Sequence, residues 1–290
     1  MARVCVVGSA NMDLTFNVNS LPRSSETVLA SSLSIAPGGK GGNQAVAAAR
    51  AGARVQFVGA VGDDPAAAQL RAHLQANGVG LGGTVAIPGP SGTAVIVVDV
   101  SGENTIVVAP GANGQLTLTA GNVREVIADC DVLLTQLEIP VRTAITAAQE
   151  ARSAGAVVIV NASPAGQDRS SLAELAALAD VVIANQAEAG EWPWRPTHLV
   201  TTLGARGARC VSPDDEFWVP APVVKAVDTT GAGDVFAGVL AAHWPRNPGS
   251  RAERLAALQR ACAAGALSTL VPGAGDCAPD AEAIDAALRS

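Results

Sequence analysis

Short runs of apolar residues alternate with alanine-rich stretches along most of this chain. Because these runs are almost continuously apolar, they predict strands that are buried on both faces. The predicted strands cover residues 3–8, 55–61, 132–135, 157–161, 181–184 and 199–202. The helical stretches between them cover residues 43–50, 65–77, 140–153 and 171–178. This alternation predicts an α/β fold with a mostly parallel sheet and helices on both faces of the sheet.

Two segments break this rhythm and predict a second, smaller sheet. Residues 12–18 with 27–35, and residues 93–98 with 105–109, have the pattern of exposed or half-exposed antiparallel strands. The segments 12–36 and 92–109 lie apart in the sequence, so a sheet made from both is discontinuous. We expect it to act as a lid at the strand ends of the main sheet. Ordinary edge hairpins are the alternative that the pattern leaves open.

The last third of the chain has a different pattern. It predicts one final strand at 223–227, followed by helices at 231–244, 250–270 and 279–288. The length of 290 residues, with no internal repeat or linker, fits a single domain over residues 1–290. Residues 78–83 match the pattern G-x-G-x-x-G. Because they follow a helix and open none, we interpret them as a flexible loop and not as a dinucleotide site.

Composition narrows the set of partners. The net charge is −7, and aromatic residues make up 3% of the chain, with no tyrosine. A general basic surface and stacking platforms are therefore lacking, and we expect no nucleic-acid or membrane partner. The apolar runs are shorter than the roughly 18 residues that a membrane span needs. The first residues predict a strand instead of a leader. Both observations favour a cytoplasmic protein. The five cysteines include no C-x-x-C pair, which argues against a disulfide framework and a structural zinc site.

A glycine-rich loop extends from Pro37 to Gln44 and leads directly into a predicted helix. Glycines let a ligand approach the backbone, and the start of a helix offers unpaired N–H groups. Lys40 and Asn43 then present hydrogen-bond donors to a polyhydroxylated or anionic small molecule. A strand-to-helix turn that needs positive φ is an equal alternative for this loop.

The segment 228–234 predicts phosphoryl chemistry. Gly231, Ala232 and Gly233 open a helix after a predicted strand, so their N–H groups favour a phosphoryl group beyond the helix start. Asp234 lies in the first turn, where a carboxylate is useful if it accepts a proton from the group that attacks the anion. An acidic residue that favours the helix dipole is the alternative for Asp234 alone. Two glycine-opened helix starts and one carboxylate together predict a phosphoryl-transfer pocket.

Polar residues also follow other predicted strands. Asn11 and Asp13 share one face of an extended chain and suit neighbouring hydroxyl groups, and Glu138 stands at another strand end. Asn185 and Glu188 are spaced i, i+3 on a predicted helix, which suits ordered water around Mg²⁺ and phosphate. The alternatives are turn formation by the first pair, a helix start for Glu138 and a capping pair for the last two residues.

Together these motifs resemble the ribokinase-like family of sugar kinases. The resemblance covers nearly the whole chain, from residues 8–13 through 38–49 and 136–138 to 228–234. It implies a three-layer α/β/α fold with a mostly parallel sheet and a small discontinuous β-sheet lid. It also implies transfer of the ATP γ-phosphoryl group to the primary 5-hydroxyl of D-ribose, which gives ribose 5-phosphate and ADP.

The resemblance also implies roles for individual residues. Asp234 is the implied general base, and the helix start at Gly231, Ala232 and Gly233 is the implied anion hole. The residues implied to hold the sugar are Asn11, Asp13, Gly39, Lys40, Asn43, Glu138 and Asp234. Those implied to face the nucleotide are Asn185, Glu188, Thr202, Gly204, Gly207 and Gly233, of which Asn185 and Glu188 are associated with Mg²⁺. An activating monovalent cation, K⁺, has an implied site at Asp228, Thr230, Ser268, Val271, Gly273 and Cys277, mainly through carbonyl oxygens.

The sequence departs from the family pattern in some places. Between Asn185 and Thr202 it is shorter by roughly twenty residues, which is room for one helix and its connection. Cys277 stands where the family often has a small hydroxyl residue. Fructose, a keto-deoxy sugar or a nucleoside remain alternative acceptors, and a non-catalytic sugar- or nucleotide-binding protein is the alternative of another class. An exposed apolar lid sheet favours a homodimer that pairs two lids.

Overall fold

A nine-stranded sheet forms the centre of the computed structural model, which describes residues 1–119, 121–246 and 249–289. Its strands are β1 (Arg3–Val7), β4 (Arg54–Val61), β5 (Gly80–Ala86), β8 (Val132–Thr135), β9 (Val157–Asn161), β10 (Val181–Asn185), β11 (His198–Thr202), β12 (Ala208–Val211) and β13 (Glu216–Val219). Their order across the sheet is β13-β12-β11-β10-β9-β8-β1-β4-β5. Neighbouring strands are parallel from β5 to β11, and β12 and β13 continue the sheet in antiparallel pairs.

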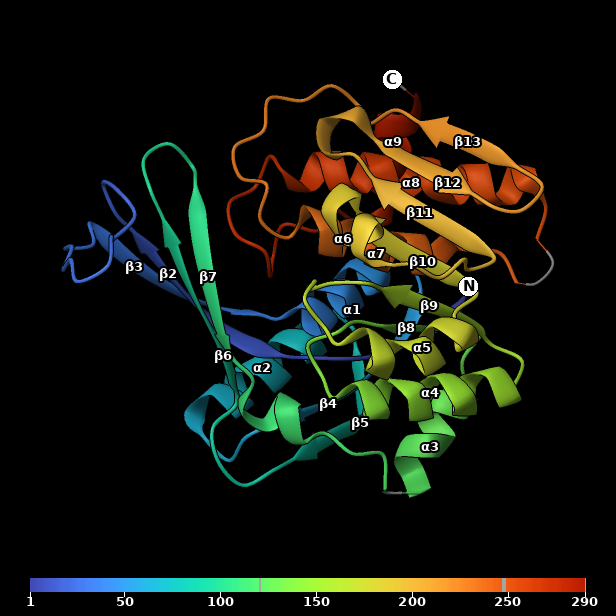
Figure 1. Cartoon of the computed structure of the whole chain (residues 1–290), viewed down its shortest axis with the longest axis horizontal. Helices are drawn as coiled ribbons and strands as arrows, with labels where there is room; N and C mark the ends of the chain where they lie inside the picture. The colour runs from blue at the N-terminus through green and yellow to red at the C-terminus, as the bar shows by residue number, and fades with distance from the viewer. Residues whose placement is uncertain (120, 247–248, 290) are drawn as a thin grey trace.

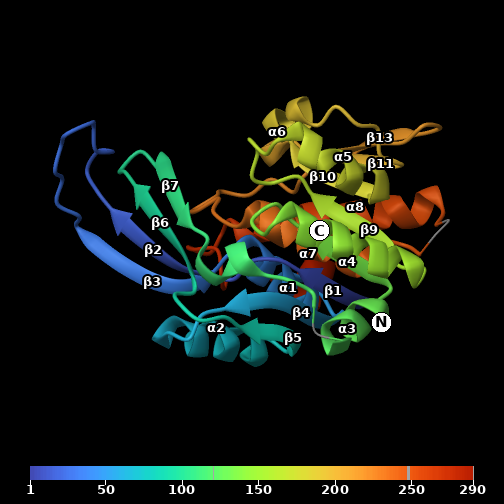
Figure 2. The same cartoon turned by 60° about the horizontal axis from the view of Figure 1, so that its bottom comes forward.

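Helices cover both faces of this sheet because its strands bury both sets of side chains. On β1, Val4 and Val6 belong to one apolar cluster, and Cys5 and Val7 belong to the other. The first cluster packs under α1 (Lys40–Arg50), α2 (Pro65–Ala76), α7 (Ala232–His243), α8 (Arg251–Ser268) and α9 (Ala281–Arg289). The second packs under α3 (Gly121–Ala128), α4 (Val141–Ser153) and α5 (Arg169–Leu178). Figure 2 shows these layers, and the predicted three-layer α/β/α fold is confirmed.

A second sheet of four strands projects from the side of the molecule (Figure 1). We call it the lid sheet; its strands are β2 (Asn11–Asn17), β3 (Ser32–Gly38), β6 (Gly92–Val98) and β7 (Asn104–Ala109). Their order is β3-β2-β6-β7, with β2 parallel to β6 and the outer pairs antiparallel. Because β2 and β6 come from distant segments, the lid sheet is discontinuous, as the sequence predicts.

Local predictions are wrong in three places. The glycine run at 78–83 opens the edge strand β5 instead of forming a flexible loop. A Cβ at Gly83 would lie 2.4 Å from Cγ2 of Val58, so glycine lets this strand approach β4 closely. Residues 223–227 form no strand, and Val223 and Val227 are solvent-exposed. Residues 27–31 lie outside β3, which begins only at Ser32.

The short connection between β10 and β11 leaves one end of the sheet covered on a single face. It holds the helix α6 (Gln186–Glu191) and a few further residues. On β13, Phe217 and Val219 are buried, whereas Glu216 and Trp218 are exposed. In Figure 1, α8 lies behind β12 and β13, and within the described residues no helix lies in front of them. Buried and exposed side chains thus alternate along β13, as expected for a strand that is covered by a helix on one face only.

None of the helices that the structure describes is both long enough and apolar enough to cross a membrane. The five cysteines are buried free thiols.

Candidate active site

The polar residues singled out in the sequence gather where the parallel strands of the main sheet end. Asn185 is the last residue of β10 and Thr202 is the last residue of β11. Asn11 follows β1, and Glu138 follows β8, which pairs with β1. Since the carboxyl ends of parallel strands share one edge of a sheet, residues far apart in the sequence meet there.

The glycine-rich loop adopts the positive-φ turn and also brings its polar residues to this edge. Gly39 has a φ of 86°, and a Cβ there would lie 2.6 Å from the backbone nitrogen of Asn11. A Cβ at Gly41 would lie 2.6 Å from the backbone nitrogen of Ser9. The first turn of α1 therefore packs directly on the chain that follows β1, so Lys40 and Asn43 begin their helix inside the site.

Asp234 is a buried carboxylate in the first turn of α7. The helix begins after Gly231, which has a φ of 79°. Asn43 donates from Nδ2 to Oδ2 of Asp234 at 3.2 Å, and Gln44 donates from Nε2 to Oδ1 at 2.9 Å. The starts of α1 and α7 thus meet at this carboxylate, and both of its oxygens accept a hydrogen bond from α1.

A second group of acidic side chains lies beside the lid sheet. Oε2 of Glu138 accepts from Oγ of Ser9 at 2.5 Å and from the backbone nitrogen of Lys40 at 3.2 Å. Oδ1 of Asp13 is buried without a hydrogen-bond partner. Burial, and next the charges of Glu138 and Asp234, raise the pKa of Asp13 to about 7, although Lys40 opposes the shift. This site therefore holds an acidic group that titrates near neutrality.

Asn11 accepts at Oδ1 from Nδ2 of Asn113 at 2.8 Å, and it is almost fully buried. The same Nδ2 also donates to the backbone oxygen of Ala10 at 3.1 Å. A Cβ at Gly92 on β6 would lie 2.2 Å from Oδ1 of Asn11, so glycine is needed for this approach. Asn11 is therefore fixed in place, with one of its polar atoms already used.

Lys40 is the positive charge that these carboxylates share. Burial alone lowers the pKa of its ammonium, but the carboxylates of Asp234, Glu138, Glu188 and Asp13 outweigh burial and raise it. The side chain also lines a cavity together with Asn185 and Glu188. Lys40 thus lies between the residues predicted for the sugar and those predicted for the nucleotide, and not with the first group alone.

Two adjoining cavities occupy this edge of the sheet. The smaller, of about 160 Å³, is lined by Lys40, Asn161, Ser163, Ile183, Ala184, Asn185, Glu188, Thr202, Gly231, Gly233 and Asp234. The larger, of about 420 Å³, is lined mainly by apolar residues from 221–226, α7 and α8, together with Thr202, Gly204 and Gly207. Because Thr202 and Gly233 line both cavities, an elongated ligand can extend from one into the other. The short β10–β11 connection contributes no residue to the lining of the larger cavity.

Asn185 and Glu188 form a capping box at the start of α6. Oδ1 of Asn185 accepts from the backbone nitrogen of Glu188 at 2.9 Å, and Oε2 of Glu188 accepts from the backbone nitrogen of Asn185 at 2.8 Å. The capping alternative is therefore realised, and the same two side chains line the smaller cavity.

The six residues predicted to hold a monovalent cation come together in part. Asp228 accepts at Oδ1 from the backbone nitrogen of Thr230 and at Oδ2 from that of Gly273, each at 2.8 Å. Burial raises the pKa of Asp228, but these hydrogen bonds outweigh burial and lower it. Sγ of Cys277 lies 3.3 Å from the oxygen of Ala274 and 3.9 Å from that of Thr230. Val271 donates its N–H to the oxygen of Ser268 at 3.2 Å.

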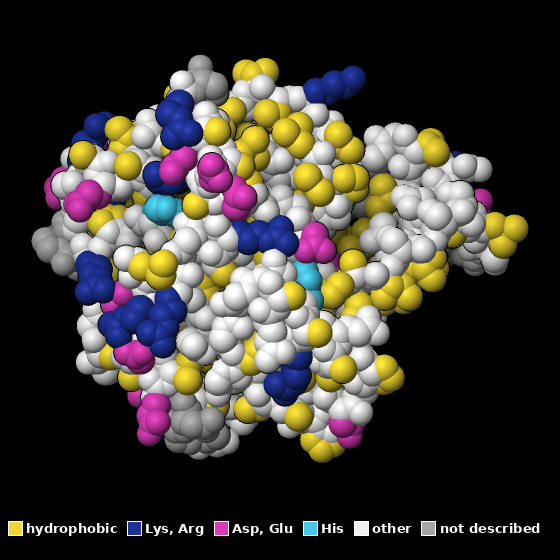
Figure 3. Space-filling model, turned by 180° about the vertical axis from the view of Figure 1, so that it is seen from behind, with side chains coloured by type: hydrophobic (Ala, Val, Ile, Leu, Met, Phe, Trp, Pro, Cys, Tyr) yellow, Lys and Arg dark blue, Asp and Glu magenta, His cyan; other side chains and the backbone are white. Residues whose placement is uncertain are grey.

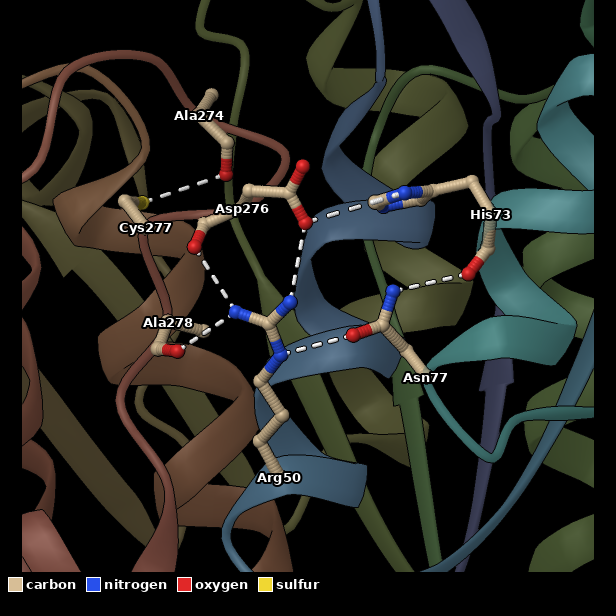
Figure 4. A network of polar contacts seen from close by, with 7 residues as sticks. All are labelled: Arg50, His73, Asn77, Ala274, Asp276, Cys277 and Ala278. Atoms are coloured by element: carbon tan, nitrogen blue, oxygen red, sulfur yellow. Dashed lines mark hydrogen bonds and ion pairs between the residues drawn. The ribbon is translucent and has the colours of Figure 1, made fainter.

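A network of polar contacts attaches this loop to α1 and α2 (Figure 4). Arg50 donates from Nη1 to the backbone oxygens of Asp276 and Ala278, each at 2.8 Å. It pairs with the Asp276 carboxylate at 3.0 Å and donates from Nε to Asn77 at 2.8 Å. Nδ1 of His73 lies 4.0 Å from the same carboxylate. The loop beside the start of α7 is thus held by residues from elsewhere in the chain.

Sequence reasoning missed several residues of the site. Gln44 contacts Asp234 directly, Asn161 lines the smaller cavity and Asn113 fixes Asn11. Gln44 stands inside the glycine-rich motif, but its partners Gln136, Asn161 and Asp234 lie 92, 117 and 190 residues away in the sequence, so spacing gives no signal for them. Residues 223–227 are predicted as a strand by their apolar composition, yet Val223, Val224 and Ala226 form part of the wall of the larger cavity.

Comparisons with known proteins identify the family and support the fold. The model of the pfkB family carbohydrate kinases matches residues 1–281. A ribokinase of Bacillus subtilis is 38% identical over 253 residues, which cover 83% of this chain and 85% of the relative. A deoxyribokinase of Salmonella typhi is 30% identical over 262 residues, with 83% and 85% covered. The structure of Arabidopsis thaliana ribokinase complexed with ribose and ATP has a TM-score of 0.87 and 26% identity, and covers 100% of this chain and 99% of that chain.

Proposed function

Because this chain belongs to the pfkB family of carbohydrate kinases, we propose that it transfers the γ-phosphoryl group of ATP to the primary 5-hydroxyl of D-ribose. The products are ribose 5-phosphate and ADP. The observation that carries this proposal is the placement of Asp234. It is a buried carboxylate at a glycine-opened helix start, it lines a cavity shared with Lys40, and both of its oxygens are oriented by α1.

In the proposed reaction, Asp234 is the general base. The sugar hydroxyl oxygen forms a bond to the γ-phosphorus, the bond to the bridging oxygen of ADP breaks, and the hydroxyl proton moves to the Asp234 carboxylate. Negative charge that develops on the transferred group faces the N–H groups at Gly231, Ala232 and Gly233 and the ammonium of Lys40. Donors fixed before the reaction stabilise this charge without reorganisation.

The sugar is proposed to lie between Asp234 and the lid sheet. Asp13 and Glu138 offer oxygens that accept from sugar hydroxyls, Asn11 offers its Nδ2 as a donor because its Oδ1 accepts from Asn113, and Asn43 offers an amide beside Asp234. A Cβ at Gly38 would lie 2.0 Å from Oδ2 of Asp13, so glycine keeps this carboxylate accessible to a hydroxyl group. Gly39 likewise keeps the backbone open to the ligand.

ATP is proposed to fill both cavities. The apolar lining of the larger cavity suits the base and ribose of the nucleotide, with Thr202, Gly204 and Gly207 at its edge. The triphosphate then extends past Thr202 and Gly233 into the smaller cavity. The γ-phosphoryl group thereby approaches Asp234 from the side opposite the lid sheet.

Asn185 and Glu188 are proposed to hold Mg²⁺ through its water shell. Within the described residues, no cluster of three or more His, Cys, Asp or Glu side chains is arranged to hold a metal ion alone. This fits Mg²⁺, which keeps several waters and binds to one or two carboxylates together with substrate phosphates. When bound there, the ion neutralises phosphate charge, while the capping box keeps Glu188 in place.

K⁺ is proposed to bind beside the helix start, through backbone oxygens at residues 228, 230, 268, 271 and 273. Oxygen donors suit a hard cation. Burial raises the pKa of the Cys277 thiol to about 11, so this side chain is a neutral and soft group that is a poor ligand for K⁺. The ion would add positive charge beside the start of α7, and the bonds of Asp228 to Thr230 and Gly273 hold that region together.

An acceptor panel tests the proposed activity. Formation of ADP from ATP is measured with ribose, deoxyribose, fructose, a keto-deoxy sugar and adenosine, with and without K⁺. We expect ribose to give the highest kcat/KM and Asp234→Asn to lower it by at least about a hundredfold, whereas Asp63→Asn, on the exposed surface, leaves it unchanged. If another acceptor gives a higher kcat/KM, that acceptor takes the place of ribose as the proposed substrate. If the protein binds ATP but turns over none of the acceptors, a non-catalytic binding protein is favoured.

Deoxyribose is a second candidate acceptor because a deoxyribokinase is among the relatives described above. It differs from ribose in one hydroxyl group. A site that uses its polar groups to bind that hydroxyl discriminates strongly against the analogue without it. The ratio of the two kcat/KM values therefore decides between these acceptors.

We further propose that residues 1–290 work as a single kinase domain and that the lid sheet closes over the acceptor. Two copies pair through their lid sheets in this proposal. Leu33, Ile35, Ile106 and Val107 are exposed apolar side chains of the lid sheet, and Figure 3 shows hydrophobic side chains on the projecting part of the molecule. We also propose a cytoplasmic location, where ATP is available to the enzyme.

A further inference from the structure

Gln44 has all the polar groups of its side chain engaged, although it is fully buried. Its Nε2 donates to Oδ1 of Asp234 at 2.9 Å and to Oδ1 of Asn161 at 2.9 Å. Its Oε1 accepts from Nε2 of Gln136 at 2.6 Å. A primary amide has two N–H donors, and both are used here. These three partners fix the direction in which the amide faces.

The partners of Gln44 come from separate elements of the fold. Asp234 is on α7, Asn161 ends β9 and Gln136 follows β8. Asn161 is itself fixed, because its Nδ2 donates to the backbone oxygen of Ile183 on β10 at 3.2 Å. The orientation of Gln44 is therefore imposed by the central sheet and not by α1 alone. A rigid scaffold of this kind is what a catalytic group needs in order to keep its geometry.

Gln44 does not line either cavity among the residues described, so it acts on the site through Asp234 and not by contact with a substrate. Its Nε2 holds Oδ1 of Asp234, and Nδ2 of the preceding residue, Asn43, holds Oδ2. Two donors on the two oxygens prevent rotation of the carboxylate.

We infer that Gln44 is a positioning residue that keeps the carboxylate of Asp234 aimed at the acceptor hydroxyl. This inference rests on the proposed role of Asp234 as general base. The role differs from sugar binding, because loss of the Gln44 donor affects the proton transfer and leaves the acceptor contacts in place.

The test compares Gln44→Met with Gln136→Met. Both substitutions remove a buried amide from the same network, but only the first removes the donor to Asp234. The measurements are kcat and KM for the acceptor at pH 7, and the Tm of each variant. For Gln44→Met we expect kcat to fall at least about tenfold, with KM for the acceptor changed less than about twofold. This split between kcat and KM is expected when a group that orients the base is lost and the acceptor contacts remain.

Gln136→Met is the matched comparison, because it removes one of the three bonds that orient Gln44 but leaves the donor to Asp234 in place. We expect it to lower Tm to a similar extent and kcat by less than about threefold. The inference is overturned if Gln44→Met keeps the original kcat, or if both variants lower kcat equally. Asp234→Asn is measured in parallel. If that variant retains activity, the proposed function of Asp234 fails, whereas an inactive Asp234→Asn with an unchanged kcat in Gln44→Met removes only the role of Gln44.

Discussion

At the scale of a single residue, the proposed contact between Asp13 and the acceptor predicts that acceptor binding depends on pH. Burial and two neighbouring carboxylates raise its pKa to about 7, and its Oδ1 has no partner in the protein. The ionised form accepts hydrogen bonds from two hydroxyl groups, so acceptor binding favours that form. Below pH 7 the acceptor must bind while Asp13 loses a proton. We therefore expect KM for the acceptor to rise by up to about tenfold per pH unit as the pH falls from 7 to 5.5.

The variant Asp13→Asn tests whether Asp13 causes this pH dependence of KM. It keeps the size of the side chain but cannot ionise, so we expect a raised KM that no longer changes between pH 5.5 and 8. The exposed Asp63→Asn is the control and should keep the pH dependence of the unchanged protein. A KM that is constant with pH in the unchanged protein, or a slope that persists in Asp13→Asn, contradicts this role.

Individual site residues were predictable to different extents. Asp234, Asn43 and Lys40 stand at glycine-opened helix starts, where local sequence already indicates an exposed backbone and a nearby ligand. Gln44 occupies the same motif, but the sequence does not indicate its contacts with Asn161 and Asp234, because only the folded sheet brings these residues together. Asp13 was predictable as a polar residue at a strand end, whereas its raised pKa depends on burial that the sequence does not contain.

At the scale of an element, the loop that holds residues 273–278 depends on Arg50 for its position. Arg50 binds two backbone oxygens and the carboxylate of Asp276, and α1 contains both this residue and the last part of the glycine-rich loop. Arg50→Met removes these contacts and leaves the carbonyl groups without this donor. We expect Tm to fall by about 3–6 °C, the shift that about 1.5 kcal/mol produces in a large domain.

The same variant tests the proposed cation site. In the unchanged protein we expect a higher rate in K⁺ than in Na⁺, and in Arg50→Met we expect the ratio of the two rates to fall toward one. Arg54→Met, at an exposed position on β4, is the control for loss of a surface arginine. Equal rates in both salts in the unchanged protein count against the site, and an unaltered Tm in Arg50→Met counts against the anchoring role.

Elements were predictable where one physical signal dominates. The central parallel strands are buried on both faces, so their continuous apolar runs identify them. β5 was missed because its glycines serve a close approach to β4, which resembles a loop in the sequence. Residues 223–227 have the apolar composition of a strand, but they line a cavity and remain exposed in part, since solvent or a ligand takes the place of a neighbouring strand.

At the scale of the whole molecule, the lid sheet carries the surface by which two copies would pair. All six residues of β7 are exposed, and β3 and β7 form the two outer strands of this sheet. Unpaired, apolar edge strands in a small projecting sheet favour pairing with another chain, and a twofold axis would bring identical surfaces together. Pairing would also hold the lid sheet in place over the acceptor, so assembly and acceptor binding should change together.

Val107→Glu tests this link because Val107 lies on β7 and is 65% exposed. A charge there disfavours burial between two lid sheets, whereas it costs little in a monomer. We expect light scattering after size-exclusion chromatography to give a dimer mass for the unchanged protein and a monomer mass for Val107→Glu. KM for the acceptor should rise in this variant while the affinity for ATP stays the same. Leu288→Glu, at an exposed position on α9, should remain a dimer. A monomeric unchanged protein, or a dimeric Val107→Glu, excludes pairing through the lid sheet.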